Sequence, residues 1–207
     1  MLNQPEITAM TMENLRTLDN FNWIMVVCLA FVLYVYTTAI EQKKWNQIAA
    51  GLALYGVHWL VEIVNALIQH IWGHALWTAS GGTSFLILVG VGIEISFMFS
   101  VAGLILSKIL PEDKNMKILG INNRILFAIL NAFLVALIEI PLAASPIFHW
   151  VYPWWGMITV WLIIYIPFFL AAFLCYDAKA KTNTIFLGSL YALNLIMMLI
   201  FIPLGWI

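Results

Sequence analysis

Six apolar stretches, each close to the length of one bilayer crossing, dominate this sequence. A helix needs roughly 20 apolar residues to cross the ~30 Å hydrocarbon core of a membrane. The predicted spans are residues 21–40, 46–71, 84–107, 123–140, 154–175 and 184–202. We therefore predict an all-α fold, a polytopic helical bundle that forms one integral-membrane domain over residues 1–207.

The composition supports a membrane location. Hydrophobic residues make up 64% of the chain and charged residues 9%. A soluble domain of this size could not cover its surface with so few polar groups. A net charge of −1 and the lack of a basic run argue against a nucleic-acid partner. Membrane lipids are the expected surroundings, and no cofactor is required by the main prediction.

The basic residues give an orientation. All but Arg16, which is in the N-terminal tail, fall in or beside the first, third and fifth connections: Lys43, Lys44, Lys108, Lys114, Lys117, Arg124, Lys179 and Lys181. Cytoplasmic loops carry the excess of Lys and Arg, so these connections are predicted to be cytoplasmic and both termini to lie outside. The outward connections carry Trp72, Trp77, Trp150, Tyr152, Trp154 and Trp155, which predict an aromatic belt at the outer interface.

The second span carries polar groups on one helical face. His58, Glu62 and Asn65 stand at i, i+4 and i+7. At ~1.5 Å per residue, His58 lies ~18 Å from the cytoplasmic start of the span, near the bilayer midplane. An imidazole and a carboxyl group there are costly unless they are paired or face a cavity. We predict a functional site at His58 and Glu62; the alternative is a mutually satisfied structural pair.

Four other spans offer polar or aromatic groups at comparable depth. Glu94 on the third span is predicted as a second catalytic acid, and Glu139 on the fourth as a cavity-lining group. The fifth and sixth spans add Trp161, Tyr165, Tyr191 and Asn194 as lining residues, and Asn65 of the second span is predicted to bind the substrate with them. Each has a structural alternative: Asn194 can join helices, Glu94 can donate to a backbone carbonyl, and Glu139 can reach the interface.

This set favours acid–base chemistry on an apolar substrate. A carboxyl group in an apolar cavity can retain its proton near neutral pH and act as a general acid, with His58 as its partner. Aromatic faces such as those of Trp161 and Tyr165 can stabilise a carbocation. A hydrophobic small molecule of lipid or isoprenoid type would reach the site through the bilayer. The predicted function is thus an isomerase or a cyclase.

The order of these features resembles the emopamil-binding (sterol isomerase, EXPERA) family. The shared pattern is His58-Trp-Leu-Val-Glu62 on one span, Glu94 on the next, and Trp161, Pro167 and Asp177-Ala178 later. The resemblance implies a sterol or cationic amphiphile surrounded by the acids and the histidine, with a protonated carboxyl group driving double-bond migration. The chain is also similar in kind to integral-membrane terpene cyclases, which use buried acids.

Two other classes of function remain open. His70, His74 and His149 all fall on the predicted outer side, and two or three imidazoles with a carboxylate would suit a transition metal or, less well, haem. Midplane acids also serve proton conduction, and the chain can equally be an oligomer or a non-catalytic subunit of a larger complex.

The remaining patterns concern packing. Small residues recur on one face of the third span, at Ser96, Ser100, Gly103 and Ser107, and of the fourth, at Ala128, Ala132 and Ala136. They predict close helix–helix approach. Pro141 is expected to end the fourth span and Pro167 to kink the fifth.

Overall fold

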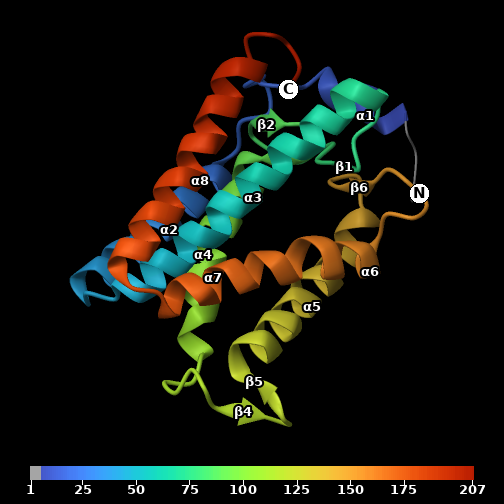
Figure 1. Cartoon of the computed structure of the whole chain (residues 1–207). Helices are drawn as coiled ribbons and strands as arrows, with labels where there is room; N and C mark the ends of the chain where they lie inside the picture. The colour runs from blue at the N-terminus through green and yellow to red at the C-terminus, as the bar shows by residue number, and fades with distance from the viewer. Residues whose placement is uncertain (1–5) are drawn as a thin grey trace.

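The computed structural model describes residues 6–207, and its dominant elements are helices (Figure 1). Within that range, five helices are long and apolar enough to cross a membrane. Four of them are α2 (Trp23–Glu41), α3 (Trp45–Trp72), α5 (Asn123–Ala143) and α8 (Ala180–Phe201). The fifth runs continuously through α6 (Met157–Thr159), η2 (Val160–Tyr165) and α7 (Ile166–Asp177). The predicted all-α membrane architecture is confirmed.

The third predicted span differs from the prediction. Only its second half is helical, as α4 (Ile93–Leu106) followed by the short 3₁₀ turn η1 (Ser107–Ile109). Its first half forms an antiparallel pair, β2 (Leu86–Leu88) with β3 (Val91–Gly92). Gly90 and Gly92 interrupt the apolar run and disfavour helix there, so α4 is ~21 Å long at 1.5 Å per residue, shorter than a full crossing.

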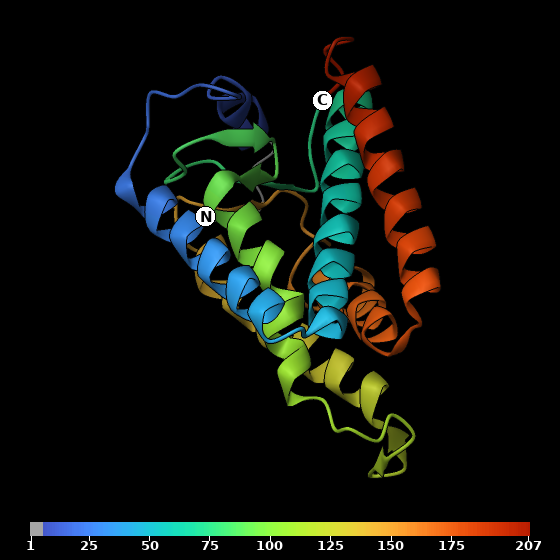
Figure 2. The same cartoon turned by 90° about the vertical axis from the view of Figure 1, so that its left-hand side faces the viewer.

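Helix α3 lies at the centre of the bundle. It packs against α2, α4, α7 and α8, and Figure 2 shows α8 running along α3 while α2 runs along α4. The approach of α4 is close because Gly103 has no side chain: a Cβ there would lie 2.5 Å from the backbone oxygen of Ala50. Ala128, Ala132 and Ala136 are fully buried on α5, which packs against α7. The predicted small-residue contacts are confirmed.

The two prolines act differently from one another. Pro141 lies inside α5, which continues to Ala143, so the expectation that it ends the helix is wrong. Pro167 follows the π-helical segment η2. Proline lacks an N–H and its ring clashes with the carbonyl four residues earlier, and a wider π turn accommodates both effects. Tyr165 is the last residue of this segment, and the kink expected at Pro167 stays a prediction.

Short antiparallel strand pairs form in the connections between the helices. β1 (Trp77–Thr78) pairs with β6 (His149–Trp150), which joins the two predicted outward connections. β4 (Lys117–Ile118) pairs with β5 (Ile121–Asn122) at the opposite end of the molecule, as Figure 1 shows. The N-terminal segment, with α1 (Glu6–Met12), lies near the C-terminus, because Arg16 Nη2 donates to the Ile207 backbone oxygen at 3.0 Å. Which end faces the cytoplasm stays a prediction.

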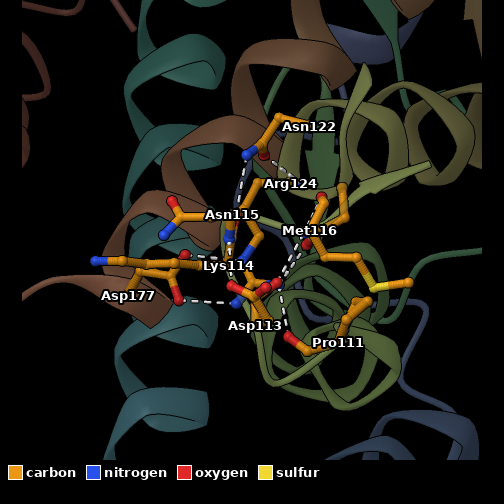
Figure 3. Close-up of polar contacts among 9 residues, drawn as sticks. Pro111, Asp113, Lys114, Asn115, Met116, Asn122, Arg124 and Asp177 are labelled. Carbon is orange, nitrogen blue, oxygen red and sulfur yellow. Dashed lines mark hydrogen bonds and ion pairs between the residues drawn. The ribbon is translucent and has the colours of Figure 1, made fainter. Parts of the chain in front are cut away.

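An ion pair fastens the end that carries the basic connections. Arg124 Nε and Nη2 donate to the two carboxylate oxygens of Asp177 at 2.8 and 2.9 Å (Figure 3). Arg124 Nη1 also donates to the Pro111 backbone oxygen at 2.8 Å. The guanidinium thereby ties the start of α5 to the end of α7 and to the loop after η1. Because these hydrogen bonds of Arg124 go to other groups of the protein, we assign this side chain a structural role.

Candidate functional site

A cavity of about 170 Å³ lies between α3, α4, α5 and the η2–α7 helix. Its wall is mainly apolar, with Val61, Phe99, Phe148 and Phe168 among the side chains that line it. Within residues 6–207, its polar lining groups come from five side chains: His58, Glu62, Trp77, Glu139 and Tyr165. Four of these five, all except Trp77, are among the site residues that the sequence predicts.

His58 and Glu62 lie one turn apart on α3 and are both buried. His58 Nε2 is 3.5 Å from Glu62 Oε1, which is close enough for an ion pair, but the two atoms make no hydrogen bond. The imidazole ring stacks on Phe99, with the ring centroids 4.2 Å apart. The imidazole is thus held by aromatic packing, and neither of its nitrogens has a hydrogen-bond partner within residues 6–207.

Glu62 is positioned by a tryptophan. Trp77 Nε1 donates to Glu62 Oε1 at 3.2 Å, and both side chains are buried. The second oxygen, Oε2, has no hydrogen-bond partner in the described part of the chain. A buried polar oxygen without a partner is costly, and such atoms concentrate at sites that bind or react.

Glu139 brings a second carboxyl group to the same cavity from α5. Trp150 Nε1 donates to its Oε2 at 3.2 Å, and the Tyr165 hydroxyl donates to its Oε1 in a short hydrogen bond. These two donors offset part of the cost that burial imposes on the charged form of the carboxyl group. The two carboxyl groups of the cavity therefore have different surroundings.

Asn65 and Gly90 support the Glu62 side of the cavity. The Asn65 amide donates to the Trp77 backbone oxygen at 3.0 Å and accepts from the Leu76 N–H at 2.8 Å. Asn65, predicted to bind the substrate, does not line the cavity, and these two bonds instead hold β1 in place. A Cβ on Gly90 would lie 2.4 Å from Glu62 Oε2 and 2.5 Å from Trp77 Nε1, so only glycine leaves room for this pair.

Glu94, the other predicted catalytic acid, does not line the cavity. It lies in the first turn of α4, where Oε2 accepts from the Thr83 hydroxyl at 2.6 Å and Oε1 from the Ser84 N–H at 2.9 Å. These bonds fix the loop before β2. The predicted place of Glu94 in the shared cavity is wrong, because that prediction takes residues 84–107 as one continuous helix.

Three predicted lining residues instead join helices. Trp161 donates to the Ile129 backbone oxygen at 3.1 Å. Tyr191 donates to the Leu52 backbone oxygen at 3.0 Å, and Asn194 to that of Gly56 at 2.8 Å, so both fasten α8 to α3. None of the three lines the cavity, and their contacts are of the helix-joining kind that the alternative for Asn194 describes.

The predicted metal ligands do not converge. His70 stacks on Trp206 with centroids 5.0 Å apart, whereas His149 Nδ1 lies 2.9 Å from the Ser80 hydroxyl. His74 is also on the outer connection, yet residues 6–207 contain no group of three or more His, Cys, Asp or Glu side chains that could hold a metal ion. Burial lowers the pKa of His149, which favours the neutral ring.

Sequence reasoning misses the two tryptophans that hold the carboxyl groups. Trp77 and Trp150 are expected in an interfacial belt, but each is only 6% exposed. Trp72 and Trp154, from the same two connections, are 61% and 59% exposed, as a belt requires. Trp77 and Trp150 lie in the paired strands β1 and β6, whereas Trp72 and Trp154 lie outside them. No local sequence signal indicates a strand pairing across more than 70 residues.

Comparisons with known proteins agree with the membrane fold. Residues 5–203 match the model of a family described as "Uncharacterized membrane protein family". A protein of Archaeoglobus fulgidus, described as "Uncharacterized protein", is 40% identical over 193 residues, which cover 90% of this chain and 91% of that protein. No solved structure matches the chain. The resemblance to the EXPERA family stays a prediction.

Proposed function

The chain belongs to the membrane protein family matched over residues 5–203, and from this premise we propose that it is an enzyme acting on an apolar lipid. The proposed chemistry is acid–base isomerisation or cyclisation at a carbon–carbon double bond, carried out in the cavity between α3, α4, α5 and α7. Glu62 and Glu139 are the proposed acid and base.

One observation carries the proposal: two carboxyl groups from different helices share one apolar cavity. Glu62 comes from α3 and Glu139 from α5, and both line the 170 Å³ space. Carboxyl groups inside a membrane are expensive, and two in the same small space are more expensive because like charges repel. A purely structural role would be served by apolar side chains at lower cost.

The different surroundings suggest different roles. Glu62, with an oxygen left without a partner in the described chain, is the proposed proton donor. Glu139, held by Trp150 and Tyr165, is the proposed acceptor. Pairs of titratable groups in contrasting environments are how enzymes separate acid from base.

The proposed step is balanced without an added reagent. Glu62 gives its proton to one carbon of the double bond, which forms a C–H bond and leaves a cation on the other carbon. Glu139 removes a proton from a carbon next to the cation, and the electrons of that C–H bond form the new double bond. The proton then returns to Glu62, with the neighbouring His58 imidazole as carrier.

The aromatic wall suits a cationic intermediate. Phe99, Tyr165 and Phe168 line the cavity, and their rings lie near one another, with centroids 5.8–6.1 Å apart. The negative faces of aromatic rings attract a cation, and the attraction grows when water is excluded. The wall would therefore favour the charged intermediate over the neutral substrate.

Deuterium uptake tests the proposal even though the substrate is unidentified. The purified protein is reconstituted into vesicles made from a total lipid extract, incubated in D₂O, and the lipids are analysed by mass spectrometry. Acid–base isomerisation places solvent-derived deuterium on carbon, so one lipid class should gain mass with active protein and not with heat-denatured protein. If no lipid gains carbon-bound deuterium, the isomerase proposal fails and proton conduction becomes the better interpretation of the two acids.

A further inference from the structure

We propose that the substrate is a flexible long-chain lipid that places only its reacting end in the cavity, while the rest of its chain leaves between α4 and α5 into the bilayer. This inference rests on the proposed function and names its substrate class. It is carried by the size of the cavity, by the position of its opening and by the side chains at that opening.

The cavity is too small for a whole lipid. Its volume is about 170 Å³, close to the roughly 150 Å³ of an engineered protein cavity that binds benzene. A space of this size holds a few carbons on either side of one double bond. A rigid system of four fused rings does not fit inside this volume, and unlike a flexible chain it cannot turn at the mouth to follow the bilayer.

The wall opens toward lipid on one side. Met98 on α4 and Ile138 on α5 both line the cavity, yet they are 61% and 56% exposed. In an integral membrane protein, an exposed apolar side chain in a helix faces the hydrocarbon chains. Each of these two side chains therefore contacts both the cavity and the bilayer, which marks the position of the mouth.

The other sides are closed by packed groups. Phe168, Val160 and Tyr165 are each at most 4% exposed on the η2–α7 side. His58 and Glu62 are 2% and 5% exposed on the α3 side. In contrast, α4 and α5 make little direct contact with one another among the described residues, although both pack against α7. A lipid chain can pass between them without displacing a packed helix interface.

Methionine at the mouth fits this role. Met98 is unbranched, and its side chain can adopt different rotamers to accommodate an irregular chain. A flexible hydrocarbon chain running past Met98 and Ile138 would exchange contacts with lipid for similar contacts with protein. We therefore expect the mouth to admit flexible hydrocarbon chains of different lengths.

Photocrosslinking tests the proposal by occupancy, independently of turnover. The probes are two forms of hexadecanol, one with a diazirine near the hydroxyl end and one with a diazirine near the methyl end, and a photoreactive sterol. Each is added to the protein in lipid nanodiscs, irradiated, and the labelled residues are mapped by mass spectrometry. We expect one hexadecanol probe to label cavity residues such as Phe99 or Glu62 and the other to label Met98 or Ile138.

Blocking variants sharpen the test. Met98→Trp and Ile138→Trp should each lower labelling of the cavity by about tenfold, since losing the burial of only two methylene groups already weakens binding by that factor. Ile140→Trp is the matched control, because Ile140 is 44% exposed on the same helix and does not line the cavity. It should leave cavity labelling unchanged.

The outcomes separate this proposal from the proposed function. Cavity labelling by the sterol that equals or exceeds that by hexadecanol would overturn the long-chain proposal in favour of a ring system. Equal labelling in Ile138→Trp and Ile140→Trp would show that the mouth lies elsewhere and would also overturn it. Neither result bears on deuterium uptake, so the acid–base proposal can stand when this one fails.

Discussion

Trp77 and Trp150 are direct partners across the β1–β6 pair, and each donates its indole N–H to a different carboxyl group of the cavity. Trp77 reaches Glu62 on α3, whereas Trp150 reaches Glu139 on α5. One pair of facing residues in two strands thus holds the carboxyl groups of two acids that lie 77 residues apart in the sequence (139 − 62). Helices α3 and α5 carry the two acids, and the strand pair holds their carboxyl groups through the two indole N–H groups.

Removing either indole N–H should destabilise the protein. Trp77→Phe and Trp150→Phe keep an aromatic ring but leave a buried carboxyl oxygen short of a donor, at a cost of about 1–3 kcal/mol each. Denaturant unfolding in detergent measures the loss. Trp72→Phe, at a tryptophan that is 61% exposed, should change the free energy of unfolding by less than ~0.5 kcal/mol. Equal effects at positions 72 and 77 would argue against a positioning role for Trp77.

A methyl group at position 90 should disturb the site. In Gly90→Ala the new Cβ would lie 2.4 Å from Glu62 Oε2 and 2.5 Å from Trp77 Nε1, so the hydrogen-bonded pair must move. Overpacking of this kind costs about 1–3 kcal/mol, which thermal unfolding would reveal. Gly188→Ala is the matched control, since nothing lies within 4 Å of a Cβ there and α8 should gain roughly 0.5–1 kcal/mol from alanine. A harmless Gly90→Ala would contradict the close packing around Glu62.

Breaking the Arg124–Asp177 pair should be costly. Asp177→Asn leaves the guanidinium of Arg124, which is 6% exposed, without its carboxylate. We expect a loss of about 3 kcal/mol, at the low end for a buried pair because Asp177 is partly exposed. The double change Arg124→Leu with Asp177→Leu should recover part of the loss, since it removes the uncompensated charge. A double variant that is less stable than Asp177→Asn would show that the other bonds of Arg124 dominate.

Acid should weaken the β1–β6 region through His149. Burial lowers the pKa of this imidazole below the ordinary value of about 6.5, so the folded state binds its proton less readily than the unfolded state. Its contribution to stability is complete above pH ~6.5 and is lost as the pH falls through the lower, folded-state pKa. The unfolding midpoint measured between pH 7 and pH 5 should decline. His149→Gln should flatten that decline, and an unchanged slope in this variant would assign the effect to other groups.

Local sequence patterns are enough to find the five long helices and both acids of the cavity. Hydropathy locates the spans, and helical periodicity places His58 and Glu62 on one face of α3. The small residues of α5 are also correctly assigned to packing. These features depend on neighbours within one helix, which is the range over which periodicity carries information.

Features that depend on distant pairing are not predictable in this way. Glu94 is misplaced because β2 and β3 replace the first half of the expected third helix. The role of Trp77 follows from its pairing with Trp150, 73 positions away (150 − 77). Tyr165 reaches Glu139 through a π-helical segment before Pro167, and no periodic pattern specifies such a segment. In each case tertiary contacts override a reasonable local expectation.

The most direct measurement compares deuterium incorporation into lipid by three single variants in D₂O. Glu62→Gln and Glu139→Gln remove the proposed acid and base while keeping their size, and each should lower incorporation by at least about a hundredfold, the usual weight of general acid–base catalysis. Glu94→Gln removes a carboxyl group that lies outside the cavity and should retain near wild-type incorporation. Full activity in Glu62→Gln and Glu139→Gln, or its loss in Glu94→Gln alone, would contradict the two-carboxyl mechanism.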